Sequence, residues 1–216
     1  MESMSDEATK GRLTSFQERR LIEDAQRGCA KSAHALIVAH QDRLHAFVWR
    51  IVRKEHDAEE VCQETFLRAF KALETFDFSY RFSTWLFTIG YRLSLNALRK
   101  RKDYAGDVDF SGMADNGRDS AGPGVLESVA NSDEARRLQG VIWDAVERLT
   151  PPQRATVLLF YKESLSCREI GEVLEMPAAT VKSHLHRARS RLKDVLEGQW
   201  VDDWSQVRFT EAGGAA

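Results

Sequence analysis

The segment 166–193, SCREIGEVLEMPAATVKSHLHRARSRLK, constrains the fold of this chain more than any other stretch. Ser166 and Glu169 have the spacing of a capping box that opens a helix, and Pro177 suits the first turn of a second helix, where its missing N–H costs nothing. The pattern predicts two short helices joined by a tight turn, a helix-turn-helix. The second helix has an apolar seam at spacings of four, three and four residues, formed by Val181, Leu185, Ala188 and Leu192.

Nearly all the charge of this segment lies on its second helix. Between Met176 and Lys193 there are five Lys or Arg residues, two His residues and no acid. A helix with one apolar stripe and one cationic face can pack on its own domain and enter the major groove of duplex DNA. A solvated surface helix is the alternative, but the capping box, the turn and the seam agree with one another and favour DNA binding.

The net charge of −2 conceals how charge is distributed along the chain. Residues 92–102 include five positive residues and no acid, whereas residues 103–134 hold eight acids and one Arg. Gly, Ser, Asp and Asn dominate this acidic stretch, which has no helical periodicity and is expected to be a flexible linker. Basic patches separated by an acidic segment indicate a protein that does not coat nucleic acid indiscriminately.

Helical periodicity on both sides of the linker, with no strand pattern, predicts an all-α fold of two small helical domains. Capping boxes are expected at Ser15–Glu18 and at Asp57–Glu60, and a fourth helix is expected to follow Ser83. His40 has a core-like spacing that favours a packing role over a ligand role. Thr150, followed by two prolines, is expected to cap a helix of the second domain. The expected division is an N-terminal tail at 1–12, a first domain at 13–102, the acidic linker at 103–133, a second domain at 134–196 and a C-terminal extension at 197–216.

Five aromatic residues and an Arg crowd the segment 76–85, FDFSYRFSTW, just before the basic stretch. Aromatic faces with interleaved cations hold unstacked bases, although an aromatic cluster taken alone is more often core. Arg92 and Asn96 follow one helical turn apart, where both side chains could hydrogen-bond base edges. The position of the cluster before a basic helix end favours contact with single-stranded or opened nucleic acid.

The helix predicted from Asp57 onward has one face that carries acidic and no basic side chains. Glu60, Gln63 and Glu64 lie together on it, and no basic residue precedes Arg68. Exposed acids usually serve solubility. Because this face is large and uniformly acidic, we expect it to bind a basic protein partner.

With these segments in this order, the chain resembles the extracytoplasmic function (ECF) sigma factors of bacterial RNA polymerase, in the sigma-70 family. The resemblance covers residues 13–196 and implies a transcription initiation factor that binds core polymerase and directs it to specific promoters. It implies no catalytic residue, metal or cofactor. Three motifs carry it: DAEEVCQETFLRAFKAL (57–73), FSTWLFTIGYRLSLNALRKRK (82–102) and LTPPQRATVLLFYKESLSCREIGEVLEMPAATVKSHLHRARSRL (149–192).

The resemblance also implies roles for individual residues and partners. The first domain (region 2 of the family) would meet the clamp of the polymerase β′ subunit through Asp57, Glu60, Gln63, Glu64 and Arg68. It would melt and read the −10 element through Phe76, Asp77, Phe78, Ser79, Tyr80, Arg81, Phe82, Trp85, Arg92, Asn96 and Arg99. The second domain (region 4) would bind the −35 duplex through Thr180, Lys182, Ser183, His184, Arg187 and Arg189. The implied partners are core RNA polymerase, through its β′ clamp and β flap, promoter DNA and an anti-sigma protein.

Departures from the family pattern bear on promoter readout and control. Arg92 stands where Asn is frequent, and a cation favours phosphate or guanine contacts. His184 replaces a frequent Arg, which predicts weaker phosphate anchoring or a mild pH sensitivity. Trp200 and Trp204 lie beyond the usual end of the family pattern. We expect them to pack on the second domain, and contact with a regulator is the alternative.

Two other function classes compete with this interpretation. A free-standing dimeric helix-turn-helix regulator that binds an operator is the alternative, and it would need a dimerisation element. An enzyme acting on nucleic acid is disfavoured, since the chain lacks an HExxH motif, a glycine-rich phosphate loop and a Cys/His metal pair. Three scattered cysteines, with no signal peptide or membrane-length apolar run, favour a cytoplasmic protein without membrane insertion.

Overall fold

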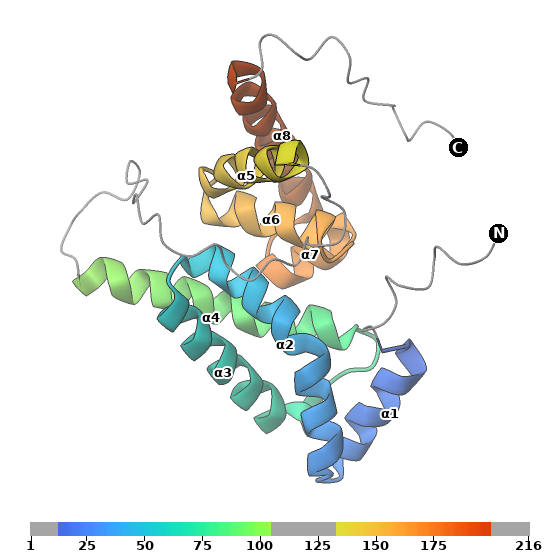
Figure 1. Ribbon diagram of the computed structural model, residues 1–216. Coiled ribbons are helices and arrows are strands. Elements are labelled where there is room, and N and C mark those ends of the chain that lie inside the picture. The colour runs from blue at the N-terminus through green and yellow to red at the C-terminus, as the bar shows by residue number, and fades with distance from the viewer. Residues whose placement is uncertain (1–12, 105–132, 200–216) are drawn as a thin grey trace, which may run out of the picture.

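The computed structural model describes residues 13–104 and 133–199, and this part of the chain is built from helices without a strand (Figure 1). The predicted all-α fold is therefore confirmed. Most of the predicted linker, together with Trp200 and Trp204, lies outside the described residues. None of the described helices is long and apolar enough to cross a membrane. The elements in chain order are α1 (Ser15–Gln26), α2 (Ala30–Val52), α3 (Glu55–Lys71), the 3₁₀ turn η1 (Leu73–Thr75), α4 (Phe82–Tyr104), α5 (Asp133–Glu147), α6 (Pro151–Tyr161), α7 (Cys167–Leu174) and α8 (Ala178–Gln199).

In the first half of the molecule α2 is central, because α1, α3 and α4 all pack against it. His40 is buried on its inner face, where its ring lies 5.2 Å from that of Phe82. Its Nε2 lies 3.0 Å from Glu18 Oε1, although the two atoms are not aligned for a hydrogen bond. A hydrogen-bonded packing role was expected for His40; the side chain is packed and buried, but within the described residues its Nε2 has no hydrogen-bond partner. Apolar residues of α2 are buried beside His40: Leu36, Leu44, Phe47, Val48 and Ile51.

In the second half α8 packs on α5, α6 and α7 through the predicted seam, of which Val181, Leu185 and Ala188 are buried. The expected capping box of α7 is confirmed. Glu169 N donates to Ser166 Oγ at 3.3 Å, and Ser166 N donates to Glu169 Oε2 at 2.8 Å. These contacts fix the start of the first helix of the helix-turn-helix.

Two predicted capping boxes in the first half are wrong. α1 is capped by Thr14, whose Oγ1 accepts from Gln17 N at 3.3 Å, so the box lies one residue before Ser15–Glu18. α3 begins at Glu55, because Arg53 ends α2 in a left-handed conformation (φ 58°) and Lys54 is already the N-cap of the next helix. Asp57 falls inside the first turn, where its carboxylate still favours the positive end of the helix dipole.

Two further helix starts differ from the prediction by one or two residues. α4 begins at Phe82, two residues earlier than a helix following Ser83. Pro177 precedes α8 directly instead of occupying its first turn, and its carbonyl accepts from Thr180 N at 2.8 Å. In both cases the helix itself lies where its apolar periodicity predicts it.

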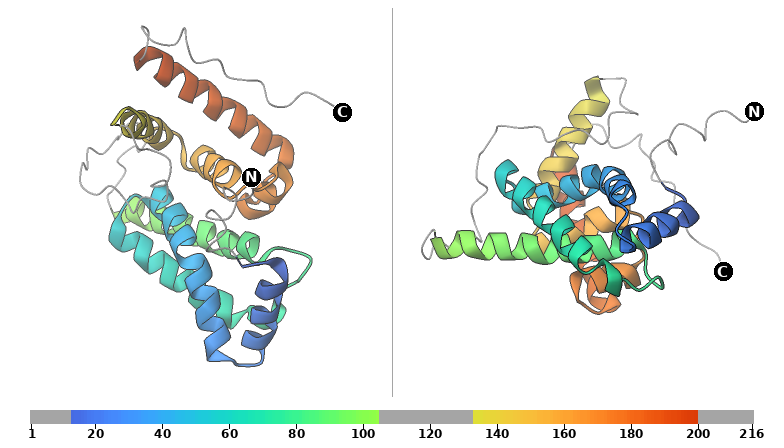
Figure 2. Two further views of the ribbon diagram at one scale, coloured as in Figure 1. Left: turned by 45° about the vertical axis from the view of Figure 1, so that its right-hand side comes forward. Right: turned by 90° about the horizontal axis from the view of Figure 1, so that it is seen from below.

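The two halves pack against each other. α7 lies on α4 and α6 lies on α2, as the views in Figures 1 and 2 show. Buried apolar residues of both halves belong to one continuous hydrophobic cluster. The first helix of the helix-turn-helix therefore rests on the long helix whose basic end was expected to meet DNA.

Candidate nucleic-acid and polymerase interfaces

The turn of the helix-turn-helix packs closely against a glycine of α7. A Cβ placed on Gly171 would lie 2.6 Å from the carbonyl oxygen of Met176, and Met176 N donates to Gly171 O at 2.9 Å. Glu175 ends α7 in a left-handed conformation (φ 55°). The backbones of α7 and of the turn approach so closely that a side chain at position 171 has no room.

The outer face of α8 carries the residues expected to meet the −35 duplex. Thr180, Lys182, Ser183 and Arg187 are all exposed, and His184 is half-buried. Ser183 Oγ donates back to Ala179 O at 3.1 Å, within the same helix. We call this surface the basic face of α8. Cations on the open side of a capped, packed helix are placed to reach phosphates and base edges.

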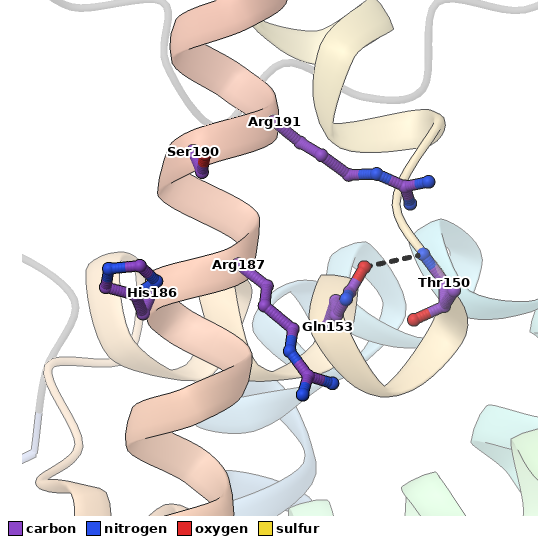
Figure 3. Close-up of a pocket in the computed structure, with 6 residues that line it drawn as sticks. All are labelled: Thr150, Gln153, His186, Arg187, Ser190 and Arg191. Atoms are coloured by element: carbon purple, nitrogen blue, oxygen red, sulfur yellow. Dashed lines mark hydrogen bonds between the residues drawn. The ribbon is translucent and has the colours of Figure 1, made fainter.

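A concavity of about 550 Å³ adjoins the basic face, and sequence reasoning missed most of its lining. Figure 3 shows the guanidinium groups of Arg187 and Arg191 extending from α8 toward Thr150 and Gln153 at the start of α6. Two guanidinium groups suit a phosphate of the DNA backbone. These residues lie far apart in the sequence, so no local motif predicts that they meet. His186 and Ser190 complete the lining.

Arg189 of α8 is exposed, but its guanidinium is held against α6. Its Nε donates to Tyr161 Oη at 2.8 Å, and its guanidinium lies 5.6 Å from the ring centre of Phe160. Tyr161 is 55% exposed. In this arrangement Arg189 joins α8 to α6 and does not project toward DNA.

The segment 76–82, which we call the −10 loop, has buried aromatic residues at its two ends and an exposed tip. Phe76 and Phe82 are buried and pack on each other and on Trp85, with ring centres 5.2 to 5.8 Å apart. These two rings therefore hold the loop in place in this conformation and are not presented to a base. The side chains presented at the surface are Asp77, Ser79, Tyr80 and Arg81.

Asp77 pre-organises the tip of the −10 loop. Its Oδ1 accepts from Ser79 N at 2.8 Å, and its Oδ2 accepts from Ser79 Oγ at 2.7 Å. These hydrogen bonds, the backbone one first, lower the pKa of the Asp77 carboxyl. The tip therefore offers a fixed carboxylate, a group suited to accept from base amino groups and unsuited to phosphates.

The outer face of α4 continues from the −10 loop and carries Arg92, Asn96 and Arg99, all exposed. Arg99 Nη2 donates to Asn96 Oδ1 at 2.6 Å. Arg92 forms an ion pair with Glu175, at the turn of the helix-turn-helix. The three residues share one face as expected, but the charge of Arg92 is already engaged by a carboxylate of the second half.

The acidic face of α3 lies away from the second half (Figure 1). Glu60 and Gln63 are exposed, and Arg68 Nε donates to Glu64 Oε1 at 2.6 Å. Leu67 is 64% exposed among these polar residues. An exposed Leu inside a charged rim is typical of a protein–protein contact.

Glu169 lies at the junction of the two halves, where its surroundings shift the pKa of its carboxyl group. Partial burial acts to raise the pKa of the Glu169 carboxyl, but hydrogen bonds from Ser166 and the charges of Arg81 and Arg168 together lower it. Its Oε1 lies 3.6 Å from Arg81 Nε. Within the described residues, no group of three or more His, Cys, Asp or Glu could hold a metal ion.

Comparison with known protein families gives two matches, in chain order. Residues 36–104 match the family described as Sigma-70 region 2, and residues 139–192 match Sigma-70, region 4. The chain is 30% identical over 181 residues to the ECF RNA polymerase sigma factor SigW of Bacillus subtilis (strain 168), covering 82% of this chain and 96% of that protein. It is 28% identical over 182 residues to the ECF RNA polymerase sigma-E factor of Escherichia coli (strain K12), covering 82% and 93%.

Two solved structures share the fold. The sigma factor RpoE, in complex with the anti-sigma factor NepR from Bartonella quintana, superposes with a TM-score of 0.62 at 23% identity. That match covers 78% of this chain and 98% of RpoE. CnrH, in complex with the cytosolic domain of CnrY, gives a TM-score of 0.60 at 22% identity and covers 84% and 98%.

Proposed function

Because the chain belongs to the ECF sigma factors of the sigma-70 family, we propose that its two helical halves divide promoter recognition between them. The protein is a transcription initiation factor that directs RNA polymerase to promoters, and a free-standing operator-binding regulator is not favoured. We assign separate parts of this function to the basic face of α8, to the −10 loop with α4, and to the acidic face of α3.

The basic face of α8 is proposed to bind the −35 duplex, and this exposed face is the observation that carries the proposal. Lys182, Ser183 and Arg187 project from a helix whose opposite side is buried in its own domain. Arg191, beside the start of α6, is added as a phosphate contact. Arg189 is proposed to position α8 through Tyr161.

The tip of the −10 loop and the outer face of α4 are proposed to hold the opened −10 element. Tyr80 offers an exposed aromatic face for stacking, and Asp77 offers a fixed acceptor. Arg92, Asn96 and Arg99 would follow the strand along α4. The buried Phe76 and Phe82, with the half-buried Trp85, would support the loop from beneath.

Two domains that each bind DNA weakly give a specific complex when both are attached to one polymerase. Each half alone has few cations for phosphates and would bind poorly at physiological salt. When both are held by core polymerase, binding of one half raises the effective concentration of the other near its site. Unstacking the −10 element costs a few kcal/mol per step, which stacking and pocket contacts offset.

The double substitution Lys182→Ala/Arg187→Ala tests the assignment of the basic face. Transcription reconstituted with core polymerase on a promoter mapped for this protein is expected to fall about 10- to 30-fold, because two DNA contacts of roughly 1 kcal/mol each are lost. Affinity for core polymerase should stay unchanged. The matched control Arg20→Ala/Lys31→Ala removes two exposed charges far from α8 and should leave transcription intact. Equal losses in both variants would contradict the assignment.

The acidic face of α3, with Leu67 at its centre, is proposed to bind the clamp of the polymerase β′ subunit. Replacing Leu67 with Ala removes an exposed apolar anchor and is expected to weaken core binding about 5- to 10-fold. Folding stability should change by less than about 0.5 kcal/mol, because the side chain is not buried. Ile142→Ala, at another exposed apolar side chain in the second half, is the control. Unchanged core affinity of the Leu67 variant, measured by fluorescence anisotropy, is the outcome that refutes this surface.

We also propose that the protein acts in the cytoplasm, where polymerase and chromosome meet, and that an anti-sigma protein controls it. The fold that it shares with the sigma factor RpoE, solved in complex with the anti-sigma factor NepR, supports such control. Purification of this chain from its own cells, followed by mass spectrometry of what remains bound, tests the second point.

A further inference from the structure

α1 contacts the segment 73–82 at three points along its length. Near its C-terminal end, Gln26 Nε2 donates to Leu73 O at 2.9 Å, in the turn η1 that leads into the −10 loop. Arg19 and Glu18, two turns earlier, make the other two contacts, one of them through a residue of α2. α1 therefore lies beside the whole connection from η1 to α4 (Figure 1).

Arg19 holds the middle of the −10 loop. Its guanidinium carbon lies 4.7 Å from the ring centre of Phe78, and its Nε donates to Glu23 Oε1 at 2.9 Å within α1. Phe78 stands between Asp77 and Ser79, whose hydrogen bonds fix the exposed tip. Because a cation is attracted to the face of an aromatic ring, Arg19 restrains the loop at the residue that joins the two halves of this tip.

Glu18 acts on the end of the loop through His40 of α2. Glu18 Oε1 lies 3.0 Å from His40 Nε2, and the His40 ring lies 5.2 Å from the ring of Phe82. The side chains of His40 and Glu18 are 6% and 21% exposed, so both are largely withdrawn from water. Phe82 in turn packs on Phe76, at the other end of the loop. The carboxylate of α1 thus lies behind the pair of rings that closes the −10 loop.

α1 precedes the residues that match Sigma-70 region 2, which begin at residue 36. Its contacts with the loop therefore lie beyond the segment on which the family match rests. Arg19 is also 61% exposed, so its side chain adds little to the core. An exposed side chain whose aromatic partner belongs to a loop is placed to restrain that loop and contributes little to the stability of the fold.

We propose that α1 is a positioning element of the −10 site, in which Arg19 and Glu18 fix the −10 loop in its base-binding conformation. Arg19 acts through Phe78. Glu18 acts through His40 on Phe82. Both are positioning residues and act without contacting DNA. This inference rests on the proposed function of the −10 loop.

Arg19→Ala in the full-length chain tests whether α1 holds the loop. Amide exchange measured by NMR reports on the tip, because Ser79 N donates to Asp77 Oδ1 at 2.8 Å and Tyr80 N donates to Asp77 O at 3.1 Å. Loss of an exposed cation–π contact should speed the exchange of both amides about threefold. The midpoint of urea unfolding should match wild type. Arg20→Ala, at the neighbouring exposed Arg of α1, should change neither measurement.

A second substitution shows whether Arg19 acts through Phe78. Phe78→Leu removes the ring but keeps an apolar side chain, and it should also speed the exchange of the tip amides. Adding Arg19→Ala to Phe78→Leu should then cause no further change, because the cation has already lost its partner. Additive effects of the two substitutions, or exchange in Arg19→Ala equal to that of wild type, would overturn the inference.

Binding of single-stranded DNA distinguishes positioning from direct contact with phosphates. The probes are a labelled oligonucleotide with the −10 sequence of a promoter mapped for this protein and its scrambled counterpart, each added to core polymerase reconstituted with the protein. Arg19→Ala should bind the −10 probe about two- to threefold more weakly and the scrambled probe as wild type does, with an unchanged dependence of affinity on salt. Arg19→Lys should keep most of the affinity, since an ammonium group can also lie over the ring.

Two results of the DNA measurement would contradict a positioning role. Unchanged affinity of Arg19→Ala for the −10 probe would show that the restraint has no effect on recognition. Equal losses on both probes, with a weaker dependence on salt, would make Arg19 a phosphate contact.

Failure of the proposed function is distinguishable from failure of this inference. If polymerase carrying the wild-type protein binds the two probes equally and gives no promoter-specific transcript, the proposed function of the −10 loop is refuted. The amide exchange of Ser79 and Tyr80 would still decide whether Arg19 holds the loop.

Discussion

Replacing Arg154 with Met is expected to lower the free energy of unfolding by about 3–5 kcal/mol. The Arg154 side chain is 5% exposed and donates only to backbone carbonyls. Burial lowers the pKa of its guanidinium to about 10, so it remains charged at neutral pH. Its acceptors are Val146 O at 3.4 Å, Glu147 O at 2.5 Å, Leu149 O at 3.0 Å and Arg50 O at 2.8 Å.

The loss is large because Arg154 satisfies the last turn of α5. Val146 and Glu147 end that helix, and the final carbonyls of a helix have no partner within it. Met matches the volume and apolar stem of Arg but donates no hydrogen bond, so buried acceptors would be left unsatisfied.

Urea unfolding followed by circular dichroism measures the change. Arg148→Ala, at an exposed Arg in the α5–α6 connection, should alter stability by less than about 0.5 kcal/mol. The loss of stability in Arg154→Lys should be smaller than in Arg154→Met and larger than in the control. Lys keeps the positive charge but lacks the several N–H donors of the guanidinium. A loss below about 1 kcal/mol for Arg154→Met would show that the carbonyls find other partners.

Replacing Gly171 with Ala should destabilise the protein by about 2–3 kcal/mol and abolish −35 recognition. The new Cβ would lie 2.6 Å from Met176 O, a backbone atom that cannot rotate away. Relief requires the turn to open, which shifts α8 relative to α7. The expected result is a lower melting temperature together with loss of promoter-specific transcription.

Gly140→Ala is the matched control for this substitution. Gly140 lies in α5, and a Cβ there would meet nothing within 4 Å. Ala is the better helix former by about 1 kcal/mol, so this variant should be more stable than wild type. The Gly-to-Ala substitution is thus predicted to destabilise the protein at position 171 and to stabilise it at position 140. Stabilisation by both would show that the helix-turn-helix tolerates a wider turn.

Local signals in the sequence predicted the fold well. Periodic apolar residues located the described helices, and the Ser166–Glu169 box was placed correctly because its contacts lie within four residues. Errors at Ser15, Asp57 and Ser83 were of one to three residues. They arose because several neighbouring residues can cap a helix, and the backbone conformation of residues such as Arg53 decides among them.

Tertiary contacts explain what the sequence did not predict. Periodicity cannot tell Leu67, which is exposed, from its buried neighbour Phe66, since both lie near the edge of the apolar stripe. The burial of Phe76 and Phe82 depends on α4 folding back beneath the loop. Arg92 and Glu175 are 83 residues apart, and no short motif predicts their ion pair. The roles of individual residues at DNA and polymerase remain predictions.

The packing of α6 and α7 onto α2 and α4 also orders events during synthesis. The first half leaves the ribosome before its cover exists. At translation rates of about 5–20 residues per second, the roughly 95 residues between the end of α4 and the end of α8 take on the order of ten seconds to appear. During that interval a nascent chain presents Arg81 and Arg92 uncovered. The ion pairs of Arg81 with Glu169 and of Arg92 with Glu175 can form only after α7 and the residue that follows it have been synthesised.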